Sequence, residues 1–197
     1  AENKMVYHKV VKQQYGEKLV QQFNNLHQND LNVIVYNFVD MLSHSKTDMD
    51  MIRELAGNDK SYRALTKTWF ENSSLLEMLK KIANSGSCLF LTTDHGTINV
   101  RVPSKVIGDR ETSANLRYKS GKRLQYQVKD VMVMENPEEY FLPAVNLTTS
   151  YIFAKENLYL TYPNNYNHFV KYFRDTYQHG GISMEEMICP FVRLSPK

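Results

Sequence analysis

An aspartate and a histidine stand close together at two places along the chain, each time after an apolar run. Asp40 and His44 follow the run LNVIVYNFV, and Asp94 and His95 follow SCLFLTT and precede Gly96. Carboxylate oxygens and imidazole nitrogens are ligands that suit Zn²⁺, Mn²⁺ or Fe²⁺, and zinc has the highest affinity of the three. A glycine lets the backbone turn tightly beside a metal or a phosphate. The two pairs therefore predict metal coordination.

A histidine that is followed by two glycines adds a fifth candidate ligand. His179 lies in the run QHGG, where the glycines would present the imidazole ring rather than pack it. His168 is expected to be partly buried on a helix, and His8 and His27 are expected at the surface. Five ligands are too many for one tetrahedral metal, but they fit two metals. Paired metals roughly 4 Å apart are a known clamp for in-line displacement at phosphorus.

The elements that must position these residues alternate between strands and helices. Residues 31–39 and 87–93 have the composition and length of fully buried strands, and shorter strands are predicted at 150–154 and 157–162. Helical periodicity is expected over 16–28, over 48–70 in two pieces that break near Gly57-Asn58, and over about 166–176. Two capping boxes predict further helix starts, at Ser74 with Glu77 and at Ser183 with Glu186.

The order strand, long helical crossover, strand is typical of a parallel sheet, so the predicted fold class is α/β. In open α/β sheets, ligands bind outside the carboxyl ends of the strands. The pairs Asp40–His44 and Asp94–His95 are therefore expected at one edge of one sheet. The alternative is that both aspartates cap helices and the histidines are incidental. Two pairs at equivalent topological positions favour the metal.

Length and composition exclude several classes of protein. The chain has 197 residues, of which 42% are hydrophobic and 23% charged, with a formal net charge of +3. These values fit one globular domain and exclude an intrinsically disordered chain. No apolar run reaches the roughly 20 residues of a membrane span, and the first ten residues do not resemble a signal peptide. Cys88 and Cys189 lie in apolar runs and are expected to be buried free thiols, which suits the reducing cytoplasm.

Positive charge gathers between residues 101 and 123. This stretch contains seven basic and two acidic residues, so it carries a local charge of +5. Beyond Val106 it has neither a helical nor a strand period, so a long surface loop is expected that is mobile in the absence of ligand. Either the loop is merely solvated or it contacts phosphate. The predicted phosphate contacts are Arg110 and Arg117, with Lys105 beside them, because a guanidinium binds phosphate bidentately.

The order and spacing of these motifs resemble a known superfamily. Asp-x-x-x-His, then Thr-Asp-His-Gly, then His-Gly-Gly followed by Ser-x-x-Glu-Glu resembles the alkaline phosphatase superfamily. TTDHGT is also similar to a motif of cofactor-independent phosphoglycerate mutases. The finer match is to PglZ-type domains, through NDLNVIVYNFVDMLSHSKT, LFLTTDHGTINV, PSKVIGDRETSANLRYK and NNYNHFVKYFRDTYQHGGISMEEMICPF. These runs resemble the C-terminal part of PorX-type response regulators.

The resemblance implies a ligand set. It assigns Asp40, His44 and His179 to one Zn²⁺, and Asp94 and His95 to a second. In the superfamily, the second metal also takes an aspartate and a nucleophilic Thr or Ser from near the start of the domain. Residues 1–197 are therefore expected to be the C-terminal portion of one PglZ domain, with the receiver domain and the nucleophile outside the chain. About one zinc is expected to bind to this chain, together with a tendency to dimerise or exchange strands.

The function implied by the resemblance is that of a zinc-dependent phosphodiesterase. It would act on oligonucleotides as the effector domain of a cytoplasmic response regulator in two-component control of type IX secretion. A non-catalytic module that docks a protein such as a sigma factor is the alternative, and a phosphoglycerate-mutase-like enzyme is a second one.

Overall fold

The computed structural model describes residues 4–144, 146 and 148–196. The chain forms two compact units, which are described separately below. Unit 1 comprises residues 1–92 and 190–197, and unit 2 comprises residues 93–189. Both contain helices and small sheets, so the predicted α/β class is confirmed.

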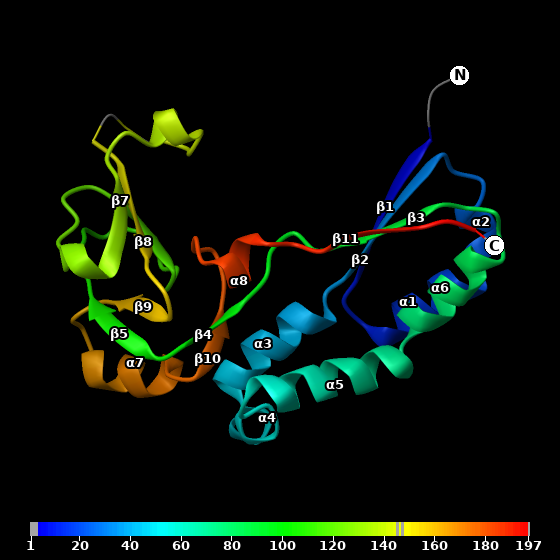
Figure 1. Ribbon diagram of the computed structural model, residues 1–197, viewed down its shortest axis with the longest axis horizontal. Coiled ribbons are helices and arrows are strands. Elements are labelled where there is room, and N and C mark those ends of the chain that lie inside the picture. Colours follow the sequence, from blue (N-terminus) through cyan, green and yellow to red (C-terminus); the bar gives the residue numbers. More distant parts are fainter. Residues whose placement is uncertain (1–3, 145, 147, 197) are drawn as a thin grey trace. The chain divides into compact units, whose positions relative to one another are not determined.

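Unit 1 contains four strands and six helices in its described part. The strands are β1 (Met5–Val10), β2 (Leu31–Tyr36), β3 (Leu89–Thr92) and β11 (Phe191–Leu194). The helices are α1 (Gln13–Gln21), α2 (Phe23–Leu26), α3 (Phe38–Asp48), α4 (Asp50–Leu55), α5 (Asp59–Glu71) and α6 (Ser74–Ala83). Figure 1 shows α1 and α6 side by side, consistent with the contacts between them.

A parallel strand pair begins unit 1. β1 pairs in parallel with β2, and α1 and α2 form the crossover between them. β1 was not predicted, although its sequence MVYHKV has the β-branched and aromatic residues of a strand. The apolar side chains of this βαβ unit pack on α6 in one cluster, whose buried members are Val10, Leu19, Leu26 and Met78.

The first predicted strand is shorter and less buried than expected. β2 ends at Tyr36, and α3 begins at Phe38, so Val39 and Asp40 belong to the helix. Leu31 and Val33 are 46% and 40% exposed. The prediction of a fully buried strand over 31–39 is therefore wrong. An apolar run alone cannot separate a strand from the first turn of a helix that follows it.

The second predicted strand also differs from expectation. β3 spans Leu89–Thr92 and pairs antiparallel with β11, while Phe90 is 54% exposed. The hydrogen-bonded ladders β1–β2 and β3–β11 are separate two-stranded sheets among the described residues. The prediction of two buried strands in one parallel sheet is therefore not met. Sequence pattern does not fix which strands pair, because pairing depends on contacts between distant parts of the chain.

The helices between these ladders follow their sequence signals closely. The expected break near Gly57-Asn58 is confirmed, since α4 ends at Leu55 and α5 begins at Asp59. Asn58 caps α5, and its Oδ1 accepts a hydrogen bond from the Ser61 amide at 3.0 Å. The cap of α6 is Ser73 rather than the predicted Ser74, a shift of one residue.

Unit 2 contains mostly short strands. They are β4 (Ile98–Val100), β5 (Val102–Lys105), β6 (Tyr118–Gly121), β7 (Val131–Met134), β8 (Ser150–Ala154), β9 (Leu158–Thr161) and β10 (Thr176–Gln178). The helices are α7 (Tyr166–Phe173), α8 (Met184–Met187) and the 3-10 turns η1 (Val128–Asp130) and η2 (Pro137–Tyr140). The strands predicted at 150–154 and 157–162 and the helix near 166–176 are confirmed, and so is the capping box of Ser183 and Glu186.

The core of unit 2 lies around β8 and β9. β8 is the central strand of an antiparallel sheet in the order β6-β8-β7, and β9 pairs in parallel with β5. Ile152 and Leu160 are fully buried in the main apolar cluster of this unit, together with Val106, Val131 and Ala154. β4 pairs antiparallel with β10, which brings residues 98–100 against residues 176–178.

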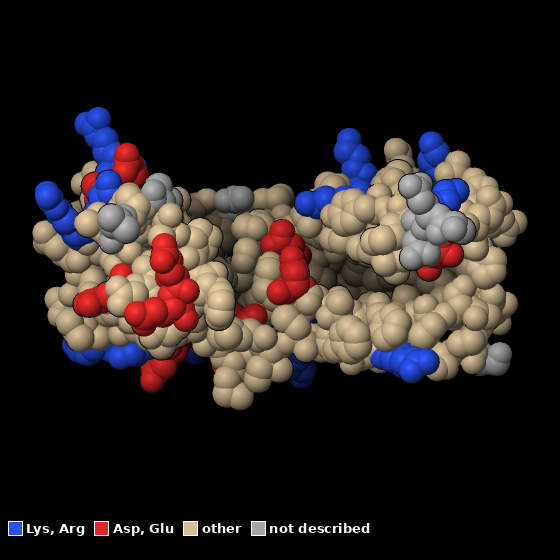
Figure 2. Space-filling view, turned by 90° about the horizontal axis from the view of Figure 1, so that it is seen from above, with Lys and Arg blue, Asp and Glu red and all other residues tan. Residues whose placement is uncertain are grey.

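The basic stretch of residues 101–123 is not a loop without structure. It contains β5, β6 and a bridge between Ile107 and Gln125. Arg117 and Lys119 are buried, with exposed fractions of 0% and 1%. The prediction of a surface loop is therefore wrong for residues 117–121, where two basic side chains are buried and β6 forms, while the predicted mobility stays a prediction. Figure 2 shows that exposed Asp and Glu side chains as well as exposed Lys and Arg side chains stand out in this view.

Two smaller predictions concern the cysteines and membranes. Both cysteines are free, as predicted, but Cys88 is exposed and Cys189 is half-buried, so the expected burial is wrong. No helix in the described part of the chain is long and apolar enough to cross a bilayer.

Candidate metal ligands in the two units

In unit 1, helical spacing brings Asp40 and His44 together. Both lie on α3, four residues apart, and His44 Nε2 lies 3.3 Å from Asp40 Oδ1. Residues four apart share one face of a helix, so this contact follows from the spacing alone. Their side chains are 36% and 62% exposed, respectively, so both are accessible to solvent. Asp40 also lies in the first turn of α3, where the helix dipole favours a negative charge.

In unit 2, the other three candidate ligands come from two distant segments. The rings of His95 and His179 stack with their centroids 4.0 Å apart and their planes at 13°. Asp94 Oδ1 lies 3.8 Å from His95 Nε2. Asp94, His95 and His179 thus lie close together within one unit, whereas the resemblance assigns His179 to a different metal from Asp94 and His95.

The ring of His95 is oriented by its own backbone neighbour. Its Nδ1 lies 3.0 Å from the carbonyl oxygen of Gly96. A carbonyl can only accept, so this contact assigns the proton to Nδ1 and leaves the lone pair on Nε2. A histidine that binds a metal commonly donates its other ring N–H to such a carbonyl. The donor set and the tautomer of His95 therefore fit a metal ligand.

Gly96 brings the turn that carries His95 against the segment at α8. The Gly96 amide donates to the carbonyl of Glu186 at 2.8 Å. A Cβ atom at Gly96 would lie 2.0 Å from the carbonyl oxygen of Glu185, which is closer than any side chain permits. The glycine of the TDHG motif is thus required by backbone packing.

Arg117, predicted as a phosphate contact, has a different role. Its guanidinium forms a bidentate ion pair with Glu186, with Nε–Oε1 and Nη2–Oε2 distances of 2.9 Å. The two side chains are 0% and 1% exposed. Burial raises the pKa of Glu186, but the hydrogen bonds and charge of Arg117 outweigh it, so the pKa lies below its usual value. The prediction of a phosphate contact at Arg117 is corrected, because its donors are engaged inside the protein.

The other two predicted phosphate contacts remain at the surface. Arg110 is exposed and follows Asp109, whose carboxylate caps a turn by accepting from the amide of Glu111. Lys105 is exposed, and its Nζ lies 4.7 Å from the centre of the Tyr166 ring, a cation–π contact. Both remain predictions.

Lys119 is a second buried cation of the basic segment. Its Nζ donates to the carbonyl of Ala114 at 3.2 Å and lies 4.4 Å from the centre of the Tyr162 ring. Burial lowers the pKa of Lys119 from 10.5 to about 8. Unlike Arg117, the amine has no carboxylate partner in the described part of the chain, so its burial is costly when it is charged.

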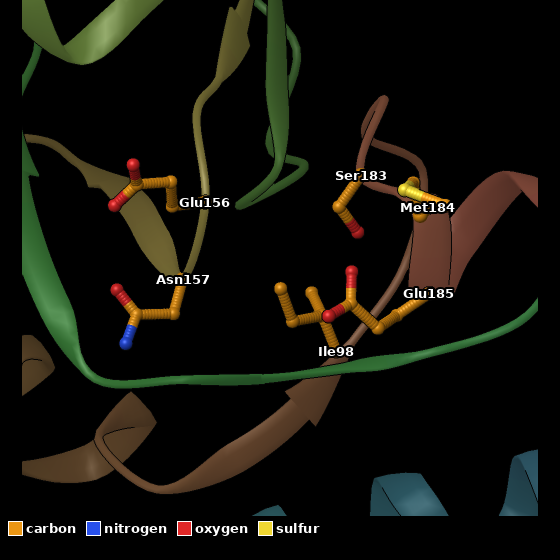
Figure 3. A pocket seen from close by; sticks show the side chains of 6 residues that line it. All are labelled: Ile98, Glu156, Asn157, Ser183, Met184 and Glu185. Atoms are coloured by element: carbon orange, nitrogen blue, oxygen red, sulfur yellow. The ribbon is translucent and has the colours of Figure 1, made fainter.

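A pocket of about 470 Å³ lies beside α8 in unit 2. Figure 3 shows the carboxylates of Glu156 and Glu185 in it, together with the side chains of Ile98, Asn157, Ser183 and Met184. Two carboxylates in one pocket repel a phosphate group. The pocket is therefore not the place where a phosphate would bind.

Sequence reasoning missed two residues of this region. Glu186 was identified only as a helix cap, and Asn115 was not singled out. Asn115 Nδ2 donates to the carbonyl of His179 at 3.3 Å, and its Oδ1 accepts from the amides of Arg117 and Tyr118. The capping box was the only signal for Glu186, and it gave no sign of the ion pair across 69 residues.

The family match defines the class of the protein as an alkaline-phosphatase-like domain. Residues 2–194 match the family described as the BREX system PglZ alkaline phosphatase-like domain. The chain belongs to this PglZ family. No match was found among curated proteins.

One solved structure supports the fold. It is a phosphonoacetate hydrolase from Sinorhizobium meliloti 1021 in complex with phosphonoformate, to which this chain is 13% identical with a TM-score of 0.50. The match covers 90% of this chain and 48% of the hydrolase, so the chain spans about half the length of that structure. At this identity the likeness concerns the fold alone.

Proposed function

We propose that this chain is the metal-binding part of a zinc-dependent phosphodiesterase. The observation that carries the proposal is the stacked pair His95 and His179 beside Asp94, within a chain of the PglZ family. Imidazole and carboxylate ligands suit zinc, and the superfamily uses metals for chemistry at phosphorus. Zinc would supply a Lewis acid that stabilises negative charge on the phosphoryl oxygens and the leaving oxygen.

The assignment of ligands rests on the family resemblance and on ligand chemistry. Asp40, His44 and His179 would hold one zinc, and Asp94 and His95 would contribute to the second. The nucleophilic Thr or Ser and the remaining carboxylate would come from residues outside this chain. The surface residues Arg110 and Lys105 would attract the phosphodiester, because their positive charges are exposed.

The substrate and the context follow the same resemblance. The substrate would be an oligonucleotide, and the domain would act in a response regulator that controls type IX secretion. A protein-docking module, with a sigma factor as the partner, would keep its interaction when zinc is removed. A phosphodiesterase would lose its activity under the same treatment.

A direct experiment compares this chain with the longer protein that contains it. At matched zinc concentrations, a chromogenic phosphodiester should be hydrolysed by the longer protein and negligibly by residues 1–197. The chain should bind about one zinc with useful affinity, because three ligands are assigned to one metal and two to the other. Comparable turnover by both proteins would place the nucleophile within residues 1–197 and overturn this part of the proposal.

A further inference from the structure

The buried ion pair of Arg117 and Glu186 sits at the centre of a polar network in unit 2. Two N–H groups of Arg117 bond the two carboxylate oxygens in parallel. The guanidinium also donates to the carbonyl of Leu158, the first residue of β9, and to the carbonyl of Ala154, the last residue of β8, the latter at 3.2 Å. The ion pair is thereby fixed to β8 and β9, the most buried strands of this unit.

The carboxylate of Glu186 holds the loop that follows His179. Its Oε1 accepts from the Gly181 amide at 2.9 Å, and its Oε2 accepts from the Ser183 amide at 3.2 Å. A Cβ atom at Gly181 would lie 2.6 Å from Oε2, so the loop reaches the carboxylate only because this residue is a glycine. The loop thus depends on Glu186 for the acceptors of two backbone amides.

The backbone of the same residue holds the turn that carries His95. The Glu186 carbonyl accepts from the Gly96 amide at 2.8 Å. His95 and His179 are 84 positions apart in the sequence, and both are fastened to Glu186. Asn115 adds a third link, since it binds the backbone of His179 and of Arg117.

Stability alone does not explain why an ion pair, rather than apolar side chains, occupies this buried position. Burying two charges costs several kcal/mol per ion, and apolar replacements of a buried pair are often neutral or stabilising. What apolar side chains cannot supply is an acceptor for the amides of Gly181 and Ser183. The distinctive contribution of the pair is therefore to hold these two backbone segments in place.

We propose that Arg117 and Glu186 form a positioning unit that sets the stacked geometry of His95 and His179 for metal binding. The proposal deepens the proposed function and rests on it for the identity of the bound metal. Glu186 fastens both histidine segments, and Arg117 fixes the orientation of the Glu186 carboxylate. Neither residue is proposed to touch the metal.

The test separates positioning from stability with two variants of the 197-residue chain. The double variant Arg117→Met/Glu186→Met removes the acceptors while keeping apolar volume in the core. The control Val131→Ala lowers the stability of the same unit by creating a cavity in the main core cluster, since Val131 is 3% exposed there. Zinc affinity is measured by chelator competition, and stability by urea denaturation.

Two readouts are expected to change in the double variant. Zinc affinity should fall at least tenfold, the lower end of the loss seen when a residue that orients metal ligands is removed. Amide exchange at Gly96, Gly181 and Ser183 in the metal-free chain should speed up at least tenfold. Val131→Ala should keep zinc affinity within twofold. In this control, the three amides should exchange no faster than its lowered global stability accounts for.

The outcomes distinguish the two proposals. Wild-type zinc affinity and protected amides in the double variant would overturn the positioning role, and so would an equal loss of zinc affinity in Val131→Ala. If the wild-type chain bound no zinc, the proposed function would fail, and amide exchange would still decide the positioning role. If the double variant did not fold, Glu186→Gln would replace it. Gln keeps the size but turns one acceptor into a donor, so its amide exchange should change in the same direction.

Discussion

The two units present metal-ligand chemistry in different ways. In unit 1, Asp40 and His44 lie on one helix, and their spacing brings them together without help from the rest of the chain. In unit 2, His95 and His179 come from distant segments that the Arg117–Glu186 pair fastens from within the core. The first arrangement is local, and the second is long-range and depends on a buried ion pair. Perturbations of the core should therefore affect the second arrangement and leave the first unchanged.

The two buried cations of unit 2 extend the comparison. Arg117 has a carboxylate partner and a full set of acceptors, whereas Lys119 has one carbonyl and the face of a tyrosine ring. Removing one partner of a buried ion pair is strongly destabilising, whereas a buried charge without a counterion itself destabilises the folded state. Substitution of Arg117 is therefore expected to destabilise unit 2, and substitution of Lys119 is expected to stabilise it.

The largest effect is expected from Arg117→Ala. The substitution leaves Glu186 as a buried carboxylate without its counterion, which costs about 3–5 kcal/mol of unfolding free energy. Hydrogen exchange should show the loss in β8 of unit 2, while β2 of unit 1 keeps its protection. Arg110→Ala, at an exposed position, serves as the control and should change stability by less than about 0.5 kcal/mol. Equal losses of protection in both units would show that they unfold together.

Lys119→Met should stabilise unit 2 at neutral pH. The pKa of Lys119 is about 8 in the folded chain and near 10.5 when exposed, so the unfolded state binds more protons between these values. The unfolding free energy of the wild type therefore rises with pH between about 8 and 10.5, by about 3 kcal/mol relative to the variant. Urea denaturation of both proteins at pH 7 and pH 10 measures the difference. Parallel pH profiles would contradict the lowered pKa.

His179→Ala should lower zinc affinity at least tenfold, as the loss of a direct ligand would. His168→Ala is the matched control, because His168 is exposed on α7 and its ring lies against the neighbouring rings of Phe169 and Tyr172. His44→Ala should also weaken zinc binding if the helical pair in unit 1 supplies ligands. An unchanged zinc affinity in His44→Ala would restrict metal binding to unit 2 and break the assignment of Asp40, His44 and His179 to one metal.

The smallest effect concerns the local order of unit 1. Asn58→Ala removes the cap of α5 and should cost about 1 kcal/mol, whereas Asn58→Ser should retain most of the stability. Trp69 is the only tryptophan of the chain, lies on α5 and stacks on Phe38 at 4.2 Å. Its fluorescence therefore reports the unfolding of unit 1. A shift of this transition without any change in zinc affinity would confirm that the cap acts locally.

Signals between residues close in sequence determined much of this protein. The break at Gly57-Asn58, the capping box of Ser183 and Glu186, and the i, i+4 contact of Asp40 with His44 all follow from short-range geometry. The order of the motifs also identified the family, which the match over residues 2–194 confirmed. Each of these depends on which residues are neighbours along the chain.

Tertiary structure decided the rest. The pairing of β3 with β11 rather than with a parallel neighbour, the burial of Arg117 and Lys119, and the pairing of Arg117 with Glu186 join segments many residues apart. A basic stretch has the same composition whether its arginines face water or a buried carboxylate. The partner that decides between these states lies 69 residues away from Arg117. Burial and charge pairing are properties of the whole fold, so no local pattern in residues 101–123 could reveal them.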